Sequence, residues 1–216
     1  MNKTITFLLG GLIVVILGAW YWSTYLNGDI LNSPPVQPLS ENSATHIYLD
    51  DVIGFSITLP TALSEVVNDV LYFVDTSYAY TAMGPGNSIK GVKFTIPGSV
   101  ASGTNLSRDS YLSVEHLEKG QACTLSSFME NSRAKAQTIY EGGAIYTFAS
   151  SSEAAAGNRY EEYLYVLSDS NPCIAVRYFV HFGAIENYDS DTISAFNKAA
   201  LLADFDSIRK TFIVRQ

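Results

Sequence analysis

A run of apolar residues near the N-terminus constrains this chain more than any other feature. Ile5 to Trp22 holds no charged side chain in 18 residues, and the first charge after Lys3 is Asp29. As a helix the run is about 27 Å long, close to the ~30 Å hydrocarbon thickness of a bilayer. The sequence therefore predicts one transmembrane helix, with the lipid bilayer as a partner through residues 5–22.

The charges and aromatic rings around the run predict its orientation. Lys3 and the amino terminus are the only positive charges nearby, so we expect the N-terminus in the cytoplasm and the rest of the chain outside it. In a bacterium this means a single-pass protein of the inner membrane with a periplasmic or extracellular domain. A cleaved signal peptide has the same charge polarity. The bulky residues of Ala19–Trp22 offer no small-residue cleavage site, which favours an uncleaved anchor over 1–26.

The composition changes twice along the chain and divides it into three parts. Residues 27–45 contain three of the seven prolines and no aromatic residue, which is typical of an extended linker. Residues 46–216 are long enough for one domain with its own core. Since Lys3, Asp29 and Glu41 are the only charged residues before it, this domain carries a formal charge of −7 out of −8. Such acidity argues against a nucleic-acid partner, because nucleic-acid binders usually carry a basic face.

The domain reads as rich in β-strands joined by turns. Short strands are expected at 46–49 and 55–59, a longer one over 71–80, a turn at 83–87 and the next strand over 89–96. Residues 98–105 are expected to form a flexible loop. Two hairpins follow, at 139–149 around a Gly-Gly turn and at 159–167 with 173–182.

Three helices are expected beside these strands. They cover 108–118 with Ser107 as N-cap, 126–137, and 192–212 with Ser190 or Asp191 as cap. The last carries an apolar stripe from Ile193 to Phe212 at helical spacing. The fold class predicted is α+β, an antiparallel β-sheet flanked by helices and preceded by one N-terminal transmembrane helix.

The chain contains two cysteines, Cys123 and Cys173. In an exported domain the expected arrangement is a disulfide between them, closing a loop of about 50 residues. The alternative, a nucleophilic cysteine paired with a histidine, requires that both thiols be free. Two cysteines are too few for a four-cysteine zinc site.

No sequence motif predicts a metal or a cofactor. The three histidines are not within metal-ligand spacing of one another, and no phosphate-binding glycine loop or nucleophile elbow occurs. We therefore expect no cofactor and no catalytic metal. Asp189 and Asp191 could hold a surface calcium ion, although capping of the following helix is the use that we favour.

The 159–182 hairpin contains the one group of side chains that could bind a ligand or take part in a reaction. If Leu167 pairs with Cys173, facing residues have numbers that sum to 340, and one face of the hairpin becomes polar and aromatic. That candidate ligand face contains Arg159, Glu161, Tyr163, Tyr165, Arg177 and His181. The opposite face, expected to form the core, contains Tyr160, Leu164, Val166, Ile174, Val176, Tyr178 and Val180.

Two interpretations of this face remain open. It could bind an anionic or aromatic ligand, or it could be covered by the helix over 108–118 with Arg177 and Glu161 as a structural pair. We favour the covered face, because a slip of one residue in register would rearrange every pair.

Two short segments resemble a known family. Gly54-Phe-Ser-Ile-Thr-Leu-Pro60 is similar to the opening strand of PsbP-like domains, and Phe205-Asp-Ser-Ile-Arg-Lys-Thr-Phe212 resembles their closing helix. The segments between them are similar to an uncharacterised family of bacterial exported, membrane-anchored proteins. The resemblance implies a sheet flanked by helices and a non-enzymatic accessory role, and it implies no catalytic residue.

These observations predict a membrane-tethered extracytoplasmic domain that binds a partner in the cell envelope without catalysis. One alternative is an envelope hydrolase that uses Glu161, Arg177 and His181. The other is a structural subunit of a membrane complex, with an envelope protein as partner.

The predicted anchor has a direct biochemical consequence. Washing membranes at alkaline pH in carbonate should leave the intact protein in the pellet, because an 18-residue apolar helix stays in the bilayer when peripheral proteins are released. Immunoblotting of pellet and supernatant measures the distribution. Release of a shortened protein into the supernatant would indicate a cleaved signal peptide instead.

Overall fold

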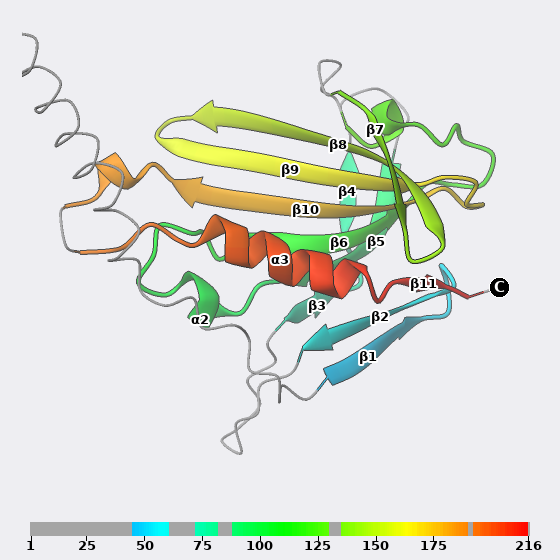
Figure 1. The fold of residues 1–216 in the computed structure, drawn as a ribbon, viewed down its shortest axis with the longest axis horizontal. Helices are drawn as coiled ribbons and strands as arrows, with labels where there is room; N and C mark the ends of the chain where they lie inside the picture. The colour runs from blue at the N-terminus through cyan, green and yellow to red at the C-terminus, as the bar shows by residue number, and fades with distance from the viewer. Residues whose placement is uncertain (1–44, 61–71, 82–87, 130–134, 190–191, 216) are drawn as a thin grey trace, which may run out of the picture. The chain divides into compact units, whose positions relative to one another are not determined.

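The computed structural model describes residues 45–60, 72–81, 88–129, 135–189 and 192–215 (Figure 1). The predicted membrane span at 5–22 and the linker up to residue 44 lie outside these ranges. Within them, none of the helices has both the length and the apolar character that crossing a bilayer requires.

The described chain is mostly antiparallel β-sheet. The large sheet has eight strands in the order β3-β5-β6-β10-β9-β8-β7, with β4 pairing to β5 beside β3. A separate small sheet has the order β1-β2-β11. The strands of the large sheet are β3 (Phe73–Asp75), β4 (Ala79–Thr81), β5 (Ser88–Thr95), β6 (Tyr111–His116), β7 (Gln137–Glu141), β8 (Ala144–Ala155), β9 (Asn158–Leu167) and β10 (Ile174–Gly183). Those of the small sheet are β1 (Thr45–Asp50), β2 (Phe55–Pro60) and β11 (Ile213–Val214).

Among the described residues two short α-helices accompany the sheets, α2 (Gly98–Ala101) and α3 (Lys198–Arg209), with 3₁₀ turns at Leu125–Ser127 and Ile185–Asn187. Helix α3 lies across one face of the large sheet, along β10 and β6, and the small sheet lies beyond it (Figure 1). We call this face of the large sheet the front face and the opposite one the back face. The predicted antiparallel sheet with helices is therefore confirmed at the level of its architecture.

The front core joins α3 and the small sheet to the large sheet. Leu201, Phe205 and Ile208 of α3 are buried in one cluster with Phe55 and Ile57 of β2. The ring of Phe205 lies 5.2 Å from that of Tyr178 on β10. Burying such side chains stabilises each by about 1.5–3 kcal/mol, so this cluster holds the two sheets and the helix together.

A second cluster covers one end of the back face. It joins Leu117, Phe128 and Met129 to side chains of the large sheet. The disulfide predicted between Cys123 and Cys173 is present, with the two Cα atoms 5.3 Å apart, and ties this segment to the start of β10. Neither cysteine is a free thiol, which removes the alternative of a cysteine nucleophile.

The hairpins expected from the sequence are confirmed. Strands β1 and β2 flank the turn that ends at Gly54, β7 and β8 flank the Gly-Gly turn, and β9 pairs with β10. Gly54, Gly142 and Gly143 all have positive φ, a conformation that favours glycine and explains why these turns are visible in the sequence.

The helix expected over 108–118 is wrong. Residues Tyr111–His116 form β6, which pairs with β5 on one side and β10 on the other. Leu112 and Val114 belong to the front core, whereas Ser113 and Glu115 are buried on the back face. A central strand buried on both faces lacks the clean alternation that identifies a strand, because polar residues can also be buried when they have partners.

Other expectations need smaller corrections. The strand expected over 71–80 is divided into β3 and β4 by a turn in which the Asp75 carboxylate accepts a hydrogen bond from the Ser77 backbone N–H at 3.0 Å. The expected loop at 98–105 begins with α2, and the helix expected over 126–137 is a 3₁₀ turn at its described start, with β7 beginning at Gln137. The turn at 83–87 lies outside the described residues.

Helix α3 begins later than expected. Its N-cap is Asn197, whose side chain accepts a hydrogen bond from the backbone N–H of Ala200 at 3.0 Å. The preceding residues are held by tertiary contacts instead: Ser194 donates its N–H to the carbonyl of Gly103, and Phe196 donates to the Asn105 side chain at 2.9 Å. The expected caps Ser190 and Asp191 lie outside the described ranges.

Removing the disulfide should weaken the fold measurably. The double substitution C123A/C173A is expected to lower the free energy of unfolding by about 2–5 kcal/mol, because a loop of about 50 residues is no longer closed in the unfolded chain. Urea unfolding followed by circular dichroism measures the change. Wild-type protein unfolded under a reducing agent should show a similar loss, and an unchanged midpoint in both would contradict the prediction.

Candidate functional site

The register of the β9–β10 hairpin decides which side chains meet. Tyr178 lies opposite Tyr163, and Arg177 lies opposite Leu164, so paired residues have numbers that sum to 341 and not to the expected 340. Since a shift of one residue exchanges the faces of a strand, the expected grouping is wrong. Arg159, Glu161, Tyr163 and Tyr165 share the front-face side of β9, whereas Arg177 and His181 belong to the back face of β10.

The predicted core face is divided in the same way. Ile174, Val176, Tyr178 and Val180 are buried in the front core as expected, but Leu164 and Val166 are buried in the back cluster. The register was ambiguous because β10 carries apolar side chains on both faces, so the hydrophobic pattern alone allows either alignment.

Arg177 and Glu115 are the most deeply buried charges of the back face. The Arg177 side chain is 1% exposed, and its guanidinium binds the fully buried carboxylate of Glu115 through two hydrogen bonds of 2.7 and 2.9 Å. It also donates to Glu162 at 3.0 Å and to the backbone carbonyl of Phe128 at 2.7 Å. Arg177 is therefore part of a structural ion-pair network, as the covered-face interpretation expected, but its partners are Glu115 and Glu162 rather than Glu161.

The network satisfies its charges internally, with one guanidinium shared by two carboxylates. Burial lowers the pKa of the Arg177 guanidinium, but the carboxylates of Glu115 and Glu162 more than offset this, and its pKa lies above its usual range. Burial raises the pKa of Glu162 despite the opposing effect of Arg177. Glu115 accepts further hydrogen bonds from Ser113 and Tyr78, at 2.8 and 3.2 Å. Because the guanidinium and the carboxylates are hydrogen-bonded to one another inside the domain, this network stabilises the fold and is poorly suited to bind a ligand.

A row of rings crosses the back face beyond this network. Tyr111 and Phe179 lie stacked with centroids 5.0 Å apart, and Tyr160 stacks on His181 at 4.5 Å. Rings stacked on one another across adjacent strands present edges rather than faces outward, so the row stabilises the sheet and is poorly suited to stack on a ligand. The His181 nitrogens face the Asp109 carboxylate at 2.9 Å and the Asn158 side-chain oxygen at 3.1 Å.

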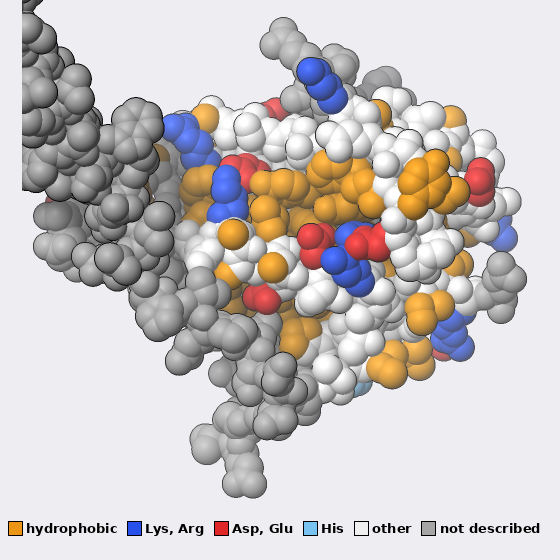
Figure 2. Space-filling model, in the orientation of Figure 1, with side chains coloured by type: hydrophobic (Ala, Val, Ile, Leu, Met, Phe, Trp, Pro, Cys, Tyr) orange, Lys and Arg blue, Asp and Glu red, His pale blue; other side chains and the backbone are white. Residues whose placement is uncertain are grey.

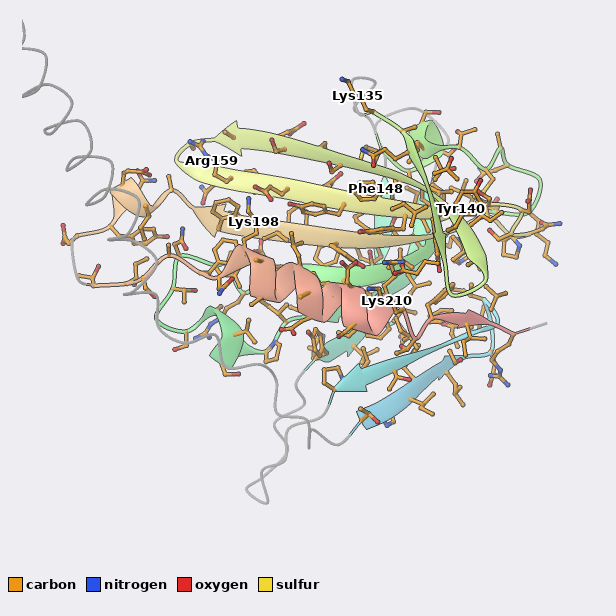
Figure 3. All side chains as sticks on the ribbon, in the orientation of Figure 1. Lys135, Tyr140, Phe148, Arg159, Lys198 and Lys210 are labelled. Carbon is orange, nitrogen blue, oxygen red and sulfur yellow. A yellow bond between two sulfur atoms is a disulfide. The ribbon has the colours of Figure 1, made fainter. Side chains whose placement is uncertain are left out.

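The front face is different, because α3 leaves part of it open. Figure 2 shows a strip of apolar side chains exposed between α3 and the strands β8 and β9. We call this strip the α3–β9 groove and define it by its half-buried lining residues Phe148, Tyr163, Phe182 and Leu202. Phe148 projects from β8 over the sheet, with Arg159 and Lys198 near one end of the strip and Lys210 near the other (Figure 3).

The rim of the groove is charged, and its charges other than Arg159 are paired. At one end Glu161, 14% exposed, accepts hydrogen bonds from Tyr163 at 2.6 Å and from Lys198 at 2.8 Å. Glu161, Tyr163 and Arg159 are thus the part of the predicted ligand face that the structure keeps together on the open front. Arg159 is exposed and forms no ion pair with any described residue.

Arg209 closes the other end of the groove. Its guanidinium lies 4.1 Å from the ring centroid of Tyr165 and donates to the Tyr178 hydroxyl at 2.7 Å. It also forms ion pairs with Glu141 and Asp206, at 2.5 and 3.2 Å. Burial raises the pKa of Tyr165 to about 12, with a further contribution from the charge of Asp206. The predicted residue Tyr165 therefore serves as a buried support under the groove.

These residues were not all visible in the sequence. Lys198 and Arg209 lie on the helix whose apolar stripe the sequence predicts, but neither residue is distinguished there by a motif. Glu115 was hidden in a segment expected to be helical. Phe148 could have been found, because it alternates with Tyr146 in a predicted strand that follows a turn.

The three residues of the hydrolase alternative do not converge. Glu161 is on the front face, His181 is on the back face, and Arg177 is enclosed by its carboxylate partners. A general acid or base must lie within hydrogen-bond reach of the same reacting group as its partners, and this arrangement does not provide that. Within the described ranges no group of three or more His, Cys, Asp or Glu side chains could hold a metal ion.

Two clefts lie outside the groove. One of about 720 Å³ is lined by the turns after β7 and β9 and by β11. The other, of about 660 Å³, lies between the β1–β2 turn, the turn that joins β3 to β4, and strand β5. Neither contains a set of titratable groups arranged for catalysis among the described residues.

Comparison with known proteins adds no family to this description. No protein-family model, no curated protein sequence and no solved structure matches the chain.

The Arg177 network predicts a strong dependence of stability on one residue. R177M should lower the free energy of unfolding by about 3–5 kcal/mol, because Glu115 is left buried without its counter-charge. The double variant E115Q/R177M should recover part of this loss. K198M, which removes a half-exposed ion pair, should cost less than about 1 kcal/mol. Urea unfolding compares the four proteins, and equal losses in R177M and K198M would contradict the prediction.

Proposed function

We propose that this chain is a membrane-tethered extracytoplasmic domain that binds a protein partner in the cell envelope and performs no catalysis. The α3–β9 groove carries this proposal. It is an open surface lined by aromatic side chains. The buried charged side chains of the domain, such as Arg177 and Arg209, are instead engaged in ion pairs within it.

The groove has the chemistry of a protein contact surface. Phe148 and Tyr163 offer large, rigid ring area that loses little conformational entropy on binding. These rings are held in place. The Tyr163 hydroxyl donates a hydrogen bond to Glu161, and Phe148 packs on Tyr165, whose ring lies against the Arg209 guanidinium. Arg159 adds an exposed cation at the end of the strip, which suits an acidic or aromatic group on the partner.

The location rests on two further observations. The disulfide favours an oxidising compartment outside the cytoplasm. The apolar run at 5–22 followed by a proline-rich linker suits a tether, and an extended linker over 27–45 reaches roughly 60 Å at about 3.1 Å per residue. Such a tether would let the domain contact membrane-embedded and soluble envelope proteins alike. The resemblance to PsbP-like domains supports the same accessory role.

The structural-subunit alternative differs in the lifetime of the contact. A permanent subunit would bury the groove in a stable assembly, whereas an accessory domain would engage it transiently. The half-exposed aromatic lining suits either arrangement, but an obligate interface is usually larger and more apolar than this strip. We therefore favour the transient partner.

Site-specific photocrosslinking tests the groove directly. A benzophenone amino acid replaces Phe148 in the full chain, expressed in its own cells, and adducts formed on illumination are identified by mass spectrometry. Phe73 on β3 is the matched control, because it is an aromatic residue that is 68% exposed and lies on a different strand.

We expect one dominant envelope-protein adduct from position 148 that is absent from position 73. Thermal unfolding of both variants verifies that the fold is intact. The same adducts at both positions, or none at position 148, would contradict a binding role for the groove. A partner protein that co-purifies in fixed stoichiometry without illumination would identify a structural subunit.

A further inference from the structure

The small sheet ends in an edge strand. Within the described part of the chain, β1 pairs with β2 and with no other strand, so the backbone groups along its outer edge have no sheet partner. Edge strands of this kind are templates for pairing with another chain unless charges, prolines or bulges block them. Thr45–Asp50 contains no proline and no lysine or arginine.

The same strand carries an exposed apolar stripe. Ile47 and Leu49 are 59% and 55% exposed, and Ile213 of β11, across β2 on the same sheet, is 61% exposed. These side chains share one face, because alternate residues of a strand point the same way and Leu49 and Ile213 both lie opposite Ser56. An open edge and an apolar face therefore coincide on β1.

The order of residues along β1 makes this edge complementary to itself. Ile47 and Leu49 lie on the outer face, and His46, Tyr48 and Asp50 lie on the other. On the N-terminal side of Tyr48 the chain reads Ile47 and then His46. On the C-terminal side it reads Leu49 and then Asp50. Two copies of such a strand match when they run antiparallel about Tyr48.

We propose that a second copy of this chain pairs with the first along β1, antiparallel and two-fold symmetric, with Tyr48 opposite its own counterpart. In this register Ile47 faces Leu49 of the second copy, and His46 faces Asp50 of the second copy, each pair occurring twice. The two small sheets become one sheet of six strands, and the apolar stripes join across the two-fold axis.

Neighbouring registers are less favourable. Centring the pair on Ile47 puts His46 opposite Tyr48 and leaves Asp50 without its partner. Centring it on Leu49 puts Asp50 opposite Tyr48 and Ile47 opposite the carboxylate of Asp51. Only the alignment about Tyr48 combines apolar residues with apolar ones and the imidazole with a carboxylate. A second copy is therefore a more specific occupant than an unrelated strand, since the complementarity arises from the strand's own sequence.

The geometry of the domain permits this dimer. Strand β1 lies at the opposite side of the domain from β8 and β9, so the α3–β9 groove stays open when two copies pair (Figure 1). In the pair the two Thr45 residues are about 20 Å apart, at ~3.3 Å per residue over a six-residue strand. Both linkers therefore reach one membrane, where a common anchor plane raises the effective concentration. The proposal does not depend on the groove having a partner.

Cysteine crosslinking of the full chain tests the register. I47C and L49C proteins, mixed in detergent and oxidised, should form a crosslinked dimer about tenfold faster than either variant alone. Directly opposite residues have Cβ atoms about 4.5–5.5 Å apart, whereas the same residue in both copies is diagonal at about 7–8 Å. The native cysteines do not interfere, since both are in the disulfide. Equal rates in the mixture and in the single variants would overturn the proposed pairing.

The mass of the purified full chain tests the dimer itself. Multi-angle light scattering in detergent should give twice 23.6 kDa for the wild type and for Y140K, and 23.6 kDa for L49K. Tyr140 is the control because it is 76% exposed on β7, away from the small sheet. Leu49 is 55% exposed, so the circular-dichroism spectrum of L49K should match that of the wild type, whereas its melting temperature should be lower because the wild-type dimer is stabilised by association. A monomeric wild type, or a dimer that persists in L49K, would overturn the proposal.

Discussion

The buried ion pair between Arg177 and Glu115 is the interaction on which the large sheet depends. One guanidinium reaches β6 through Glu115, β9 through Glu162 and the covering segment through the carbonyl of Phe128. Removing two charges from water costs several kcal/mol each, and that cost is offset only when every remaining donor and acceptor has a partner. The pair therefore fixes the relative positions of three strands and the segment that covers them, in a way that apolar packing alone would not.

Register follows from the same constraint. The hydrophobic pattern of β10 permits two alignments with β9, and they differ in whether Arg177 meets Glu161 or Glu162 on its own face of the sheet. In the observed alignment Arg177 has Glu162 of β9 on one side and Ser113 and Glu115 of β6 on the other, all on the back face. The charge on the central strand thus selects between alignments that apolar residues cannot distinguish. It also explains why a polar residue such as Glu115 can be fully buried in the middle of a sheet.

The parts of the fold that could be predicted are those with a local cause. The hairpins at Gly54 and at Gly142–Gly143 follow from glycines with positive φ, and the disulfide follows from two cysteines in a chain that the sequence predicts to be exported. Strand β6 could not be recognised from the sequence, because the partner that allows Glu115 to be buried in it is Arg177, some 60 residues later in the chain. For the same reason the predicted ligand face is divided: its four β9 residues share the front face, whereas Arg177 and His181 lie on the back face.

The distribution of charge connects this architecture to the proposed location. Arg177 and Arg209 are buried in internal pairs, and exposed cations such as Lys198 and Lys210 are engaged by Glu161 and Glu141. The cations of the domain are thus largely neutralised within it, and its formal charge of −7 is carried by the remaining surface carboxylates. An anionic leaflet repels such a surface within about a Debye length. A tethered domain of this kind would therefore stand away from the lipid, and its open apolar surfaces would meet proteins rather than the bilayer.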